Sequence, residues 1–234
     1  MIRFGGALVL LDIEGTASPL TYVRDVLFPH ARNNLVPFLE RHGSEPTVRA
    51  VLELMVAEAR PGEPGITDLS ELAALVNELM DQDAKQTGLK QLQGLIWEEG
   101  FASGALHSEV FPDVPRALPA WVNCRLQVRI FSSGSSHAQR LFFGHTTAGN
   151  LRHYLAGHHD TTTGPKRSAA RYMAIAREAG VAPGEILYLS DITAELDAAR
   201  EAGFATALVL RPGNAPNPPH THPVIESFAE IEIA

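Results

Sequence analysis

The sequence lacks three features that would define its class at once. Its one cysteine, Cys124, forms no disulfide within the chain, which fits a reducing compartment and a cytoplasmic location. No apolar run approaches the roughly 18 residues that a membrane span needs, so we expect no membrane partner. Positive charge is scarce: 19 Lys and Arg face 27 Asp and Glu, a net charge of −8. Because phosphate contact needs a basic face, this balance argues against nucleic-acid binding.

What the sequence has is an ordinary globular composition. Of its 234 residues, 45% are hydrophobic and 20% are charged, which is close to globular averages. This length suits one or two domains and a sizeable buried core. The short apolar run near the N-terminus ends in Asp12 and Glu14 instead of a small-residue cleavage site, so we interpret it as a buried strand and not as a signal peptide.

Four apolar runs predict strands that are covered on both faces: Ala7–Leu11, Leu126–Phe131, Ile186–Leu189 and Ala205–Leu210. Helical segments separate the last three runs: Ser136–Phe143 and Arg167–Ala179 lie between the second and third, and Thr193–Ala202 lies between the third and fourth. Gly180 and Gly203 follow the last two helices, as glycines commonly do at helix ends. Strands that alternate with helices predict an α/β fold with a parallel sheet.

A long segment without a convincing strand separates the first two strands. It contains three amphipathic helical patterns, Val48–Ala59, Leu69–Met80 and Leu89–Trp97. We therefore predict a helical cap domain of residues 19–110, inserted after the first strand and lying over the strand ends. Residues 1–18 and 111–234 would form the α/β catalytic core. The Pro-rich stretch Pro212–Pro223 is typical of a loop.

Acidic side chains follow two of the predicted strands. Asp12 and Glu14 come after the first strand, and Asp191 follows the third. Ligands of open α/β sheets bind at this edge. Two carboxylates on one side of an extended segment repel each other unless a cation lies between them or one is protonated, and a hard ion such as Mg²⁺ suits oxygen ligands. A strand-ending Asp that merely caps a turn is the alternative for Asp12 alone.

Hydroxyl groups and one lysine complete the set of polar residues at this edge. Ser132 and Ser133 precede Gly134 at the start of a helix, a combination that receives phosphate. Lys166, just before another helix, would balance phosphate charge. Taken singly, Ser135 is an ordinary helix cap and a lysine in such a place is usually solvated. Taken together, these residues predict a phosphoryl-transfer site with a carboxylate nucleophile.

Other reactive residue types carry less weight. The ten histidines match no zinc-binding spacing, and we expect those in the groups 153–159 and 220–222 to be solvated or to cap helices. Cys124 has no evident catalytic partner, so we expect a thiol packed in the core.

The order of motifs, D-x-E-G-T, S-S-G-S, G-P-K and S-D, resembles the haloacid dehalogenase superfamily of phosphohydrolases. That superfamily usually carries D-x-D-G-T, so Glu14 is a departure. One branch has the same departure, the enolase-phosphatases (acireductone synthases) of methionine salvage. The chain is similar to this branch over L-L-D-I-E-G-T and over the segments Val23–Pro29, Leu89–Trp97, Ala138–His145 and Val209–Ala215. The resemblance spans nearly the whole chain.

This resemblance implies a role for each candidate residue. The fold would be a Rossmann-like core of haloacid dehalogenase type with the inserted cap. Asp12 would be the nucleophile, and Glu14 would occupy the acid/base position. One Mg²⁺ per chain would be bound by Asp12, Glu14 and Asp191, with Glu14 contributing its side chain or its backbone carbonyl. The phosphate-binding residues would be Ser132, Ser133 and Lys166.

The implied substrate is the phosphorylated diketone 2,3-diketo-5-methylthiopentyl-1-phosphate. The family enolises it and then removes the phosphate, which gives 1,2-dihydroxy-3-keto-5-methylthiopentene. The enolisation base is open between Glu14 and a side chain of the cap. Three alternatives compete: a small-molecule phosphatase with a different cap specificity, a metal-independent haloacid dehalogenase, and a catalytically silent binder of phosphorylated ligands. We expect a monomer, because no exposed apolar stripe stands out in the sequence.

Overall fold

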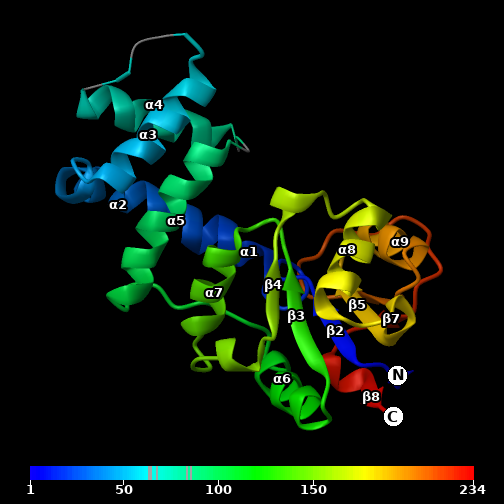
Figure 1. Ribbon diagram of the computed structural model, residues 1–234. Coiled ribbons are helices and arrows are strands. Elements are labelled where there is room, and N and C mark those ends of the chain that lie inside the picture. The colour runs from blue at the N-terminus through cyan, green and yellow to red at the C-terminus, as the bar shows by residue number, and fades with distance from the viewer. Residues whose placement is uncertain (63–64, 67, 83, 85) are drawn as a thin grey trace. The chain divides into compact units, whose positions relative to one another are not determined.

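The chain divides into an α/β unit and a helical unit. The computed structural model describes residues 1–62, 65–66, 68–82, 84 and 86–234 (Figure 1). The α/β unit comprises Met1–Tyr22 and His107–Ala234, and the helical unit comprises Val23–Leu106. The division falls after Tyr22 and before His107, a few residues inside the predicted limits of the insertion. That the helical unit serves as a cap stays a prediction.

The α/β unit is built on a six-stranded parallel sheet with the strand order β4-β3-β2-β5-β6-β7. In that order the strands are Gly157–His159, Gln127–Phe131, Leu8–Leu11, Ile186–Ser190, Ala205–Val209 and Val224–Ile225. All neighbours pair in parallel, with Leu11 opposite Ile130 on one side and Leu189 on the other. The carboxyl ends of β2, β3 and β5 therefore lie next to one another.

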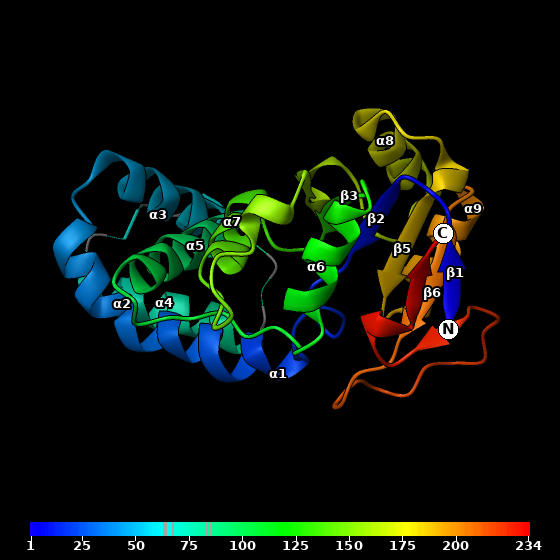
Figure 2. The same ribbon diagram turned by 90° about the horizontal axis from the view of Figure 1, so that it is seen from below.

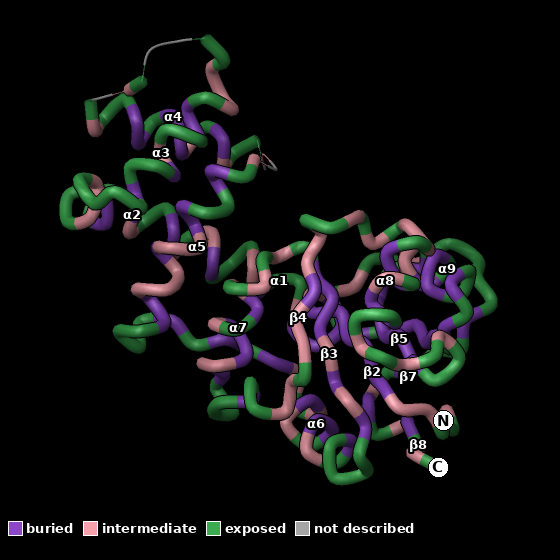
Figure 3. Tube along the Cα trace, viewed as in Figure 1, coloured by how far each residue is buried: buried purple, intermediate pink, exposed green. Residues whose placement is uncertain are grey.

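Helices cover both faces of the central strands. Successive residues of β2 point to opposite faces, and all four are buried (Figure 3). Leu8 and Leu10 belong to a core cluster that includes Tyr172 and Leu196 of α8 (Ala169–Ala179) and α9 (Thr193–Glu201). Across the sheet, α6 (Val114–Asn123) lies against β3 (Figure 2). The continuous apolar run of β2 thus reflects burial on both sides.

Shorter elements complete the α/β unit. β1 (Ile2–Phe4) and β8 (Ile231–Ile233) pair in parallel, which places the two chain ends side by side (Figure 2). The remaining helices are α1 (Leu20–Tyr22), α7 (Ser136–Gly144) and four 3₁₀ turns, Arg152–Tyr154, Thr161–Thr163, Pro183–Glu185 and Phe228–Glu230.

The helical unit buries one apolar cluster among four α-helices: α2 (Phe28–His42), α3 (Pro46–Ala59), α4 (Leu69–Asp81) and α5 (Thr87–Ala102). A π-helical turn, Val23–Leu27, precedes α2. Met55 and Leu92 are fully buried in the cluster, on the facing helices α3 and α5. No strand lies among the described residues of this unit, as the sequence predicts. No described helix is at once long and apolar enough to cross a membrane.

The structure corrects two minor expectations. Cys124 is exposed, because it lies at the end of α6 where the chain turns towards β3. His159 and His222 are buried instead of solvated: His159 Nδ1 lies 3.1 Å from Glu178 Oε2, and His222 Nδ1 lies 2.8 Å from Thr206 Oγ1.

Candidate active site

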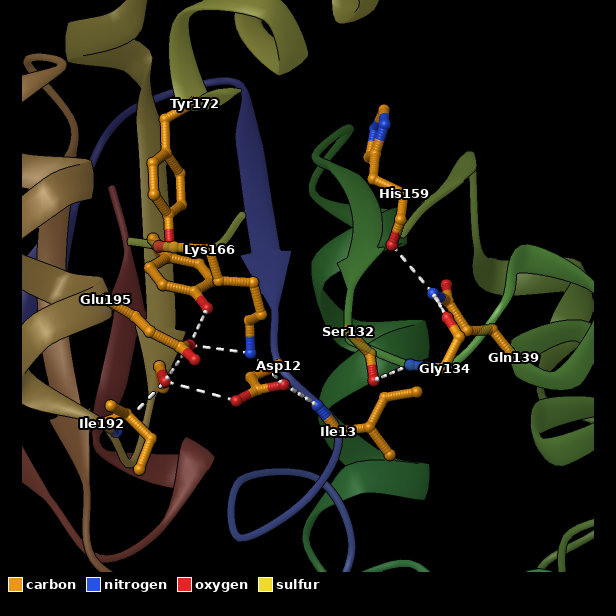
Figure 4. A network of polar contacts seen from close by, with 12 residues as sticks. Asp12, Ile13, Ser132, Gly134, Gln139, His159, Lys166, Tyr172, Ile192 and Glu195 are labelled. Atoms are coloured by element: carbon orange, nitrogen blue, oxygen red, sulfur yellow. Dashed lines mark hydrogen bonds and ion pairs between the residues drawn. The ribbon is translucent and has the colours of Figure 1, made fainter. Parts of the chain in front are cut away.

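Asp12 is the first residue after β2, and it is held in place from several directions. Its side chain is buried, with 4% of the residue exposed. Oδ1 accepts a hydrogen bond from the backbone N–H of Ile13 at 2.7 Å and lies 2.7 Å from Lys166 Nζ. The Asp12 backbone N–H donates to the carbonyl of Leu189 on β5. The carboxylate is therefore fixed at the carboxyl end of the central strand (Figure 4).

Lys166 bridges Asp12 to Glu195, a residue that the sequence analysis missed. Nζ lies 2.7 Å from Glu195 Oε2, and the lysine side chain is only 10% exposed (Figure 4). Glu195 Oε2 also accepts a hydrogen bond from the Tyr188 hydroxyl at 2.8 Å. The Ser190 hydroxyl lies 3.0 Å from Glu195 Oε2 and 3.3 Å from Asp12 Oδ2, so it can donate to either. Glu195 holds the ammonium group beside the Asp12 carboxylate.

Glu195 had a detectable signal in the sequence. It follows Asp191 by four residues and lies in the first turn of α9. An acidic side chain is favourable there because the first turn of a helix carries partial positive charge. Its ion pair with the buried Lys166 could not be predicted from that position alone.

Burial and neighbouring charges shift the pKa values of this cluster. Burial raises the pKa of the Asp12 carboxyl to about 7, although the Lys166 ammonium pulls it down, and the charges of Glu195 and Asp191 raise it further. Burial alone would lower the pKa of Lys166, but the charges of Asp12 and Glu195 outweigh it and raise that pKa. Lys166 is therefore positively charged at neutral pH, and this one cation lies among the acidic residues Asp12, Glu195 and Asp191.

Glu14 lies in the turn that follows Asp12, and Asp191 lies beside the same turn at Gly15. Burial raises the pKa of Asp191 to about 6, and the charge of Glu14 contributes to the rise. Gly15, with φ +70°, packs so closely that a Cβ at this position would collide with the Asp191 carboxylate. The chain stops being extended at Ile13, whose carbonyl accepts the N–H groups of residues 16–18. Asp191 thus lies beside Gly15, and its charge interacts with those of Asp12 and Glu14.

The predicted phosphate-binding serines lie at the end of β3, next to β2. Ser132 is buried, and its hydroxyl accepts the backbone N–H of Gly134 at 3.3 Å (Figure 4). Ser133 is exposed on the same turn. Ser135 caps α7 by accepting a hydrogen bond from the N–H of Ala138, which confirms its predicted role as an ordinary helix cap. The structure brings Asp12 and Lys166 into direct contact and gives the serines a place on the adjacent strand end.

Asp12 and Asp191 could accommodate a divalent cation, but in the part of the chain that the structure describes three acidic side chains do not surround one place. Among the described residues, no three His, Cys, Asp or Glu side chains are grouped to hold a metal ion. Asp12 and Asp191 nevertheless have raised pKa values because both are buried and the charge of Asp191 acts on Asp12. A hard cation beside these two carboxylates would offset that repulsion. Two carboxylates completed by other oxygen atoms would suit such a cation.

Comparison with known proteins identifies close relatives. No family model matches the chain. The curated protein "Enolase-phosphatase E1" of Synechococcus elongatus is 47% identical over 229 residues, covering 95% of this chain and 96% of the relative. Proteins of the same name from Methylococcus capsulatus and Sorangium cellulosum are 48% and 45% identical and cover 88% and 95% of this chain.

Solved structures agree with this result. The UTR4 protein of Saccharomyces cerevisiae is 34% identical, with a TM-score of 0.81 over 97% of this chain and 100% of that protein. A predicted phosphoglycolate phosphatase from Haemophilus somnus (TM-score 0.55, 17% identical, 96% of each chain) and an L-2-haloacid dehalogenase (0.55, 16%, 97% and 96%) share the fold. The expected α/β fold of haloacid dehalogenase type is therefore confirmed, and the chain belongs to the enolase-phosphatase E1 family.

Proposed function

We propose that the protein is the enolase-phosphatase of methionine salvage, which converts 2,3-diketo-5-methylthiopentyl-1-phosphate to 1,2-dihydroxy-3-keto-5-methylthiopentene and phosphate. The carrying observation is a buried carboxylate, Asp12, paired with Lys166 at the carboxyl end of the central strand. That edge is where open α/β sheets bind ligands. The family membership supports the choice of substrate.

In this proposal Asp12 is the nucleophile. Its carboxylate attacks phosphorus, the bond between phosphorus and the ester oxygen breaks, and an aspartyl-phosphate forms. Glu14 gives a proton to the departing oxygen and then takes one from the water that attacks the aspartyl-phosphate. That second attack releases phosphate and restores the Asp12 carboxylate. Lys166 and Ser132 would hold the phosphoryl oxygens in line, with Ser133 contributing from the exposed side of the turn.

Enolisation precedes phosphate release and moves one proton. A base removes the proton from the carbon next to a carbonyl, and the carbonyl oxygen becomes the enol oxygen as it is protonated. Glu14 is our candidate for the base, and a side chain of the helical unit is the alternative. Both chemical steps would then use a carboxylate on the turn after Asp12.

The family implies a divalent metal, and we propose one Mg²⁺ per chain. Asp12 and Asp191 would hold it with their carboxylates, and Glu14 would contribute its carbonyl oxygen, because no three acidic side chains among the described residues are arranged to hold a metal ion. A bound Mg²⁺ offsets the repulsion between an anionic nucleophile and an anionic ester. We also propose a monomer, located in the cytoplasm. The single free cysteine, Cys124, supports the reducing compartment.

A product assay tests this proposal. Incubation with the diketone phosphate and Mg²⁺ should release phosphate while the absorbance of the enediol rises transiently. Asp12→Asn should abolish both signals, by at least about 10³-fold, and leave the circular dichroism spectrum unchanged. Turnover of that variant within tenfold of the parent would contradict the aspartyl-phosphate mechanism. Phosphate release from many simple esters, without preference for the diketone, would favour a phosphatase of different specificity.

A further inference from the structure

Two side chains far along the sequence hold the turn that carries Glu14. Arg211 and Asn214 follow β6 and belong to the loop before β7. Arg211 Nε donates to the carbonyl of Thr16 at 3.0 Å, and Asn214 Nδ2 donates to the carbonyl of Gly15 at 2.9 Å. The two acceptors are the carbonyls that directly follow Glu14.

Arg211 has little freedom to move from this position. The residue is buried, and its guanidinium lies between the rings of Phe111 and Phe228, 4.5 and 4.7 Å from their centres. Nη2 lies 2.9 Å from Asp113 Oδ2, and Nη1 donates to the carbonyl of Glu226 at 2.9 Å. Because the planar guanidinium has fixed donor directions, these contacts also fix the donor that faces the turn.

Asn214 ties the turn to the sheet. Its amide nitrogen lies 2.9 Å from the carbonyl of Gly15 and 3.3 Å from that of Val209, the last residue of β6. Gly15 is also the residue whose Cα faces the Asp191 carboxylate. A shift of Gly15 would therefore alter the relation between Glu14 and Asp191.

Asp12 is held largely by other contacts. These are the hydrogen bond to Leu189 on β5 and the Lys166 ion pair, together with the N–H of Ile13 at the start of the turn. Ser132 directly follows β3, a strand on the other side of β2 from β6. The nucleophile and the phosphate-binding residues thus have one set of supports, and the proton-transfer residue has another.

We propose that Arg211 and Asn214 are positioning residues, which hold the carbonyls of Thr16 and Gly15 so that Glu14 faces the reacting oxygen. This inference rests on the proposed function, because it takes Glu14 as the acid/base group. The loss of either donor leaves a buried carbonyl without that partner, and the turn then relaxes. Proton transfer suffers, while phosphate binding by Lys166 and Ser132 is retained.

The test compares kinetic constants of matched variants of the full chain. Asn214→Asp keeps the shape and removes the donor, and Asn214→Ala removes the donor without adding charge. We expect kcat to fall about 10- to 100-fold in both, since misplacement of a catalytic group by about 1 Å can cost 10²-fold. KM and the inhibition constant of inorganic phosphate should stay within about threefold of the parent. Asn123→Asp, on the exposed end of α6, is the control and should match the parent.

A second pair tests Arg211. Arg211→Lys keeps the charge but has a single ammonium, which cannot reach Thr16, Glu226 and Asp113 together, so it should also lower kcat more than it changes KM. Arg200 is an exposed arginine of α9 that pairs with Asp197, and Arg200→Lys should leave kcat unchanged. Arg211 lies in the core of the α/β unit, so the melting temperature of Arg211→Lys is measured together with its kinetic constants. If this variant does not fold, the two Asn214 variants alone test the inference.

Two outcomes overturn the inference. One is a parent-like kcat in both Asn214 variants, and the other is a joint loss of kcat, phosphate affinity and melting temperature, which indicates a purely structural role. The comparison is repeated with an alkyl phosphate ester, whose hydrolysis needs the same proton transfer. If the parent hydrolyses this ester but not the diketone phosphate, the proposed substrate is wrong. The kinetic constants of the variants on the ester then still test the positioning roles of Arg211 and Asn214.

Discussion

At the scale of single residues, the site depends on one buried cation between two carboxylates. Lys166 lies 2.7 Å from an oxygen of Asp12 and 2.7 Å from an oxygen of Glu195. A lysine before a helix is usually solvated, and this one is not because the two acids offset the cost of its burial. The arrangement keeps a positive charge beside Asp12, the proposed nucleophile, where the phosphoryl group of the proposed substrate would need it.

Lys166→Met should therefore destabilise the α/β unit as well as stop turnover. Removal of one partner leaves buried carboxylates without compensation, which costs about 3–5 kcal/mol in comparable sites. The cost should grow with pH. A carboxyl whose pKa is raised in the folded state gains protons on folding, so its contribution to stability is present at low pH and is lost as the pH rises through that pKa. Urea denaturation at pH 5 and pH 8 measures the loss of stability and its dependence on pH, and an assay of phosphate release measures the loss of turnover.

Lys90→Met is the matched control for this prediction. Lys90 is exposed on α5 and should change the free energy of unfolding by no more than about 0.5 kcal/mol. Equal stability of Lys166→Met and Lys90→Met at pH 8 would contradict the view that the Asp12 and Glu195 charges need Lys166.

The residues that belong to sequence motifs could be predicted from the sequence, but the residues that hold them in place could not. Asp12, Lys166 and Ser132 follow strand ends or precede helices, so their common edge follows from the α/β pattern. Glu195 and Arg211 act through contacts with residues 29 and 195 positions away, Lys166 and Thr16. Such contacts depend on how helices and loops pack, which a local pattern does not encode.

At the scale of elements, the turn after β2 is shaped by a glycine. Gly15 has φ +70°, which other residues adopt at a cost. A Cβ there would also collide with the Asp191 carboxylate. Gly15→Ala should therefore displace Asp191 or the turn itself. We expect a loss of more than about 2 kcal/mol of stability and a kcat at least about tenfold lower, measured by denaturation and by phosphate release.

Gly180→Ala separates backbone strain from this collision. Gly180 ends α8 with φ +68°, and nothing lies within 4 Å of the position of its Cβ. The substitution should cost about 1–2 kcal/mol of stability and leave kcat unchanged. If Gly15→Ala behaved in the same way, the close packing against Asp191 would have no functional meaning.

Long, strongly patterned elements were predicted well, and short or proline-containing ones were not. The four central strands and six helices lie where the apolar runs and amphipathic patterns place them, with ends shifted by a few residues. The helices α2 and α6 contain Pro37 and Pro119 in their interiors, where a proline removes a backbone hydrogen bond and argues against a helix. The two- and three-residue strands β1, β4, β7 and β8 carry too few residues for a periodic signal.

At the scale of the whole molecule, buried histidines couple stability to pH. Burial lowers the pKa of His159 to about 4, from an ordinary value of 6.5. Between these two values the unfolded chain binds a proton that the folded chain does not. The free energy of unfolding contributed by His159 therefore falls as the pH drops from 6.5 towards 4. Asp12 and Asp191 act in the opposite direction, because their pKa values are raised.

A variant comparison isolates the histidine from these acids. In His159→Gln the carboxyl contributions remain and the histidine contribution is gone. Denaturation between pH 7 and pH 4.5 should show that the parent loses more stability than the variant over this range. Parallel curves for the two proteins would mean that His159 is protonated equally in the folded and unfolded states.

Metal dependence links the site to the stability of the α/β unit. The family implies a divalent cation, and Asp12 and Asp191 are buried carboxylates whose mutual repulsion a cation would offset. A chelator should therefore abolish turnover, and added Mg²⁺ should restore it. Because a ligand that binds only the folded state stabilises it, millimolar Mg²⁺ should also raise the melting temperature of the chelated protein.

The thermal readout distinguishes a bound ion from a general salt effect. Asp191→Asn removes one proposed ligand and should lose most of the rise in melting temperature with Mg²⁺. Asp197→Asn changes an exposed acid of α9 and should keep it. Because the test measures binding apart from turnover, it remains informative in a variant that is inactive. Full turnover in chelator, with no thermal response to Mg²⁺ in the parent, would instead favour the chemistry of a metal-independent dehalogenase at this site.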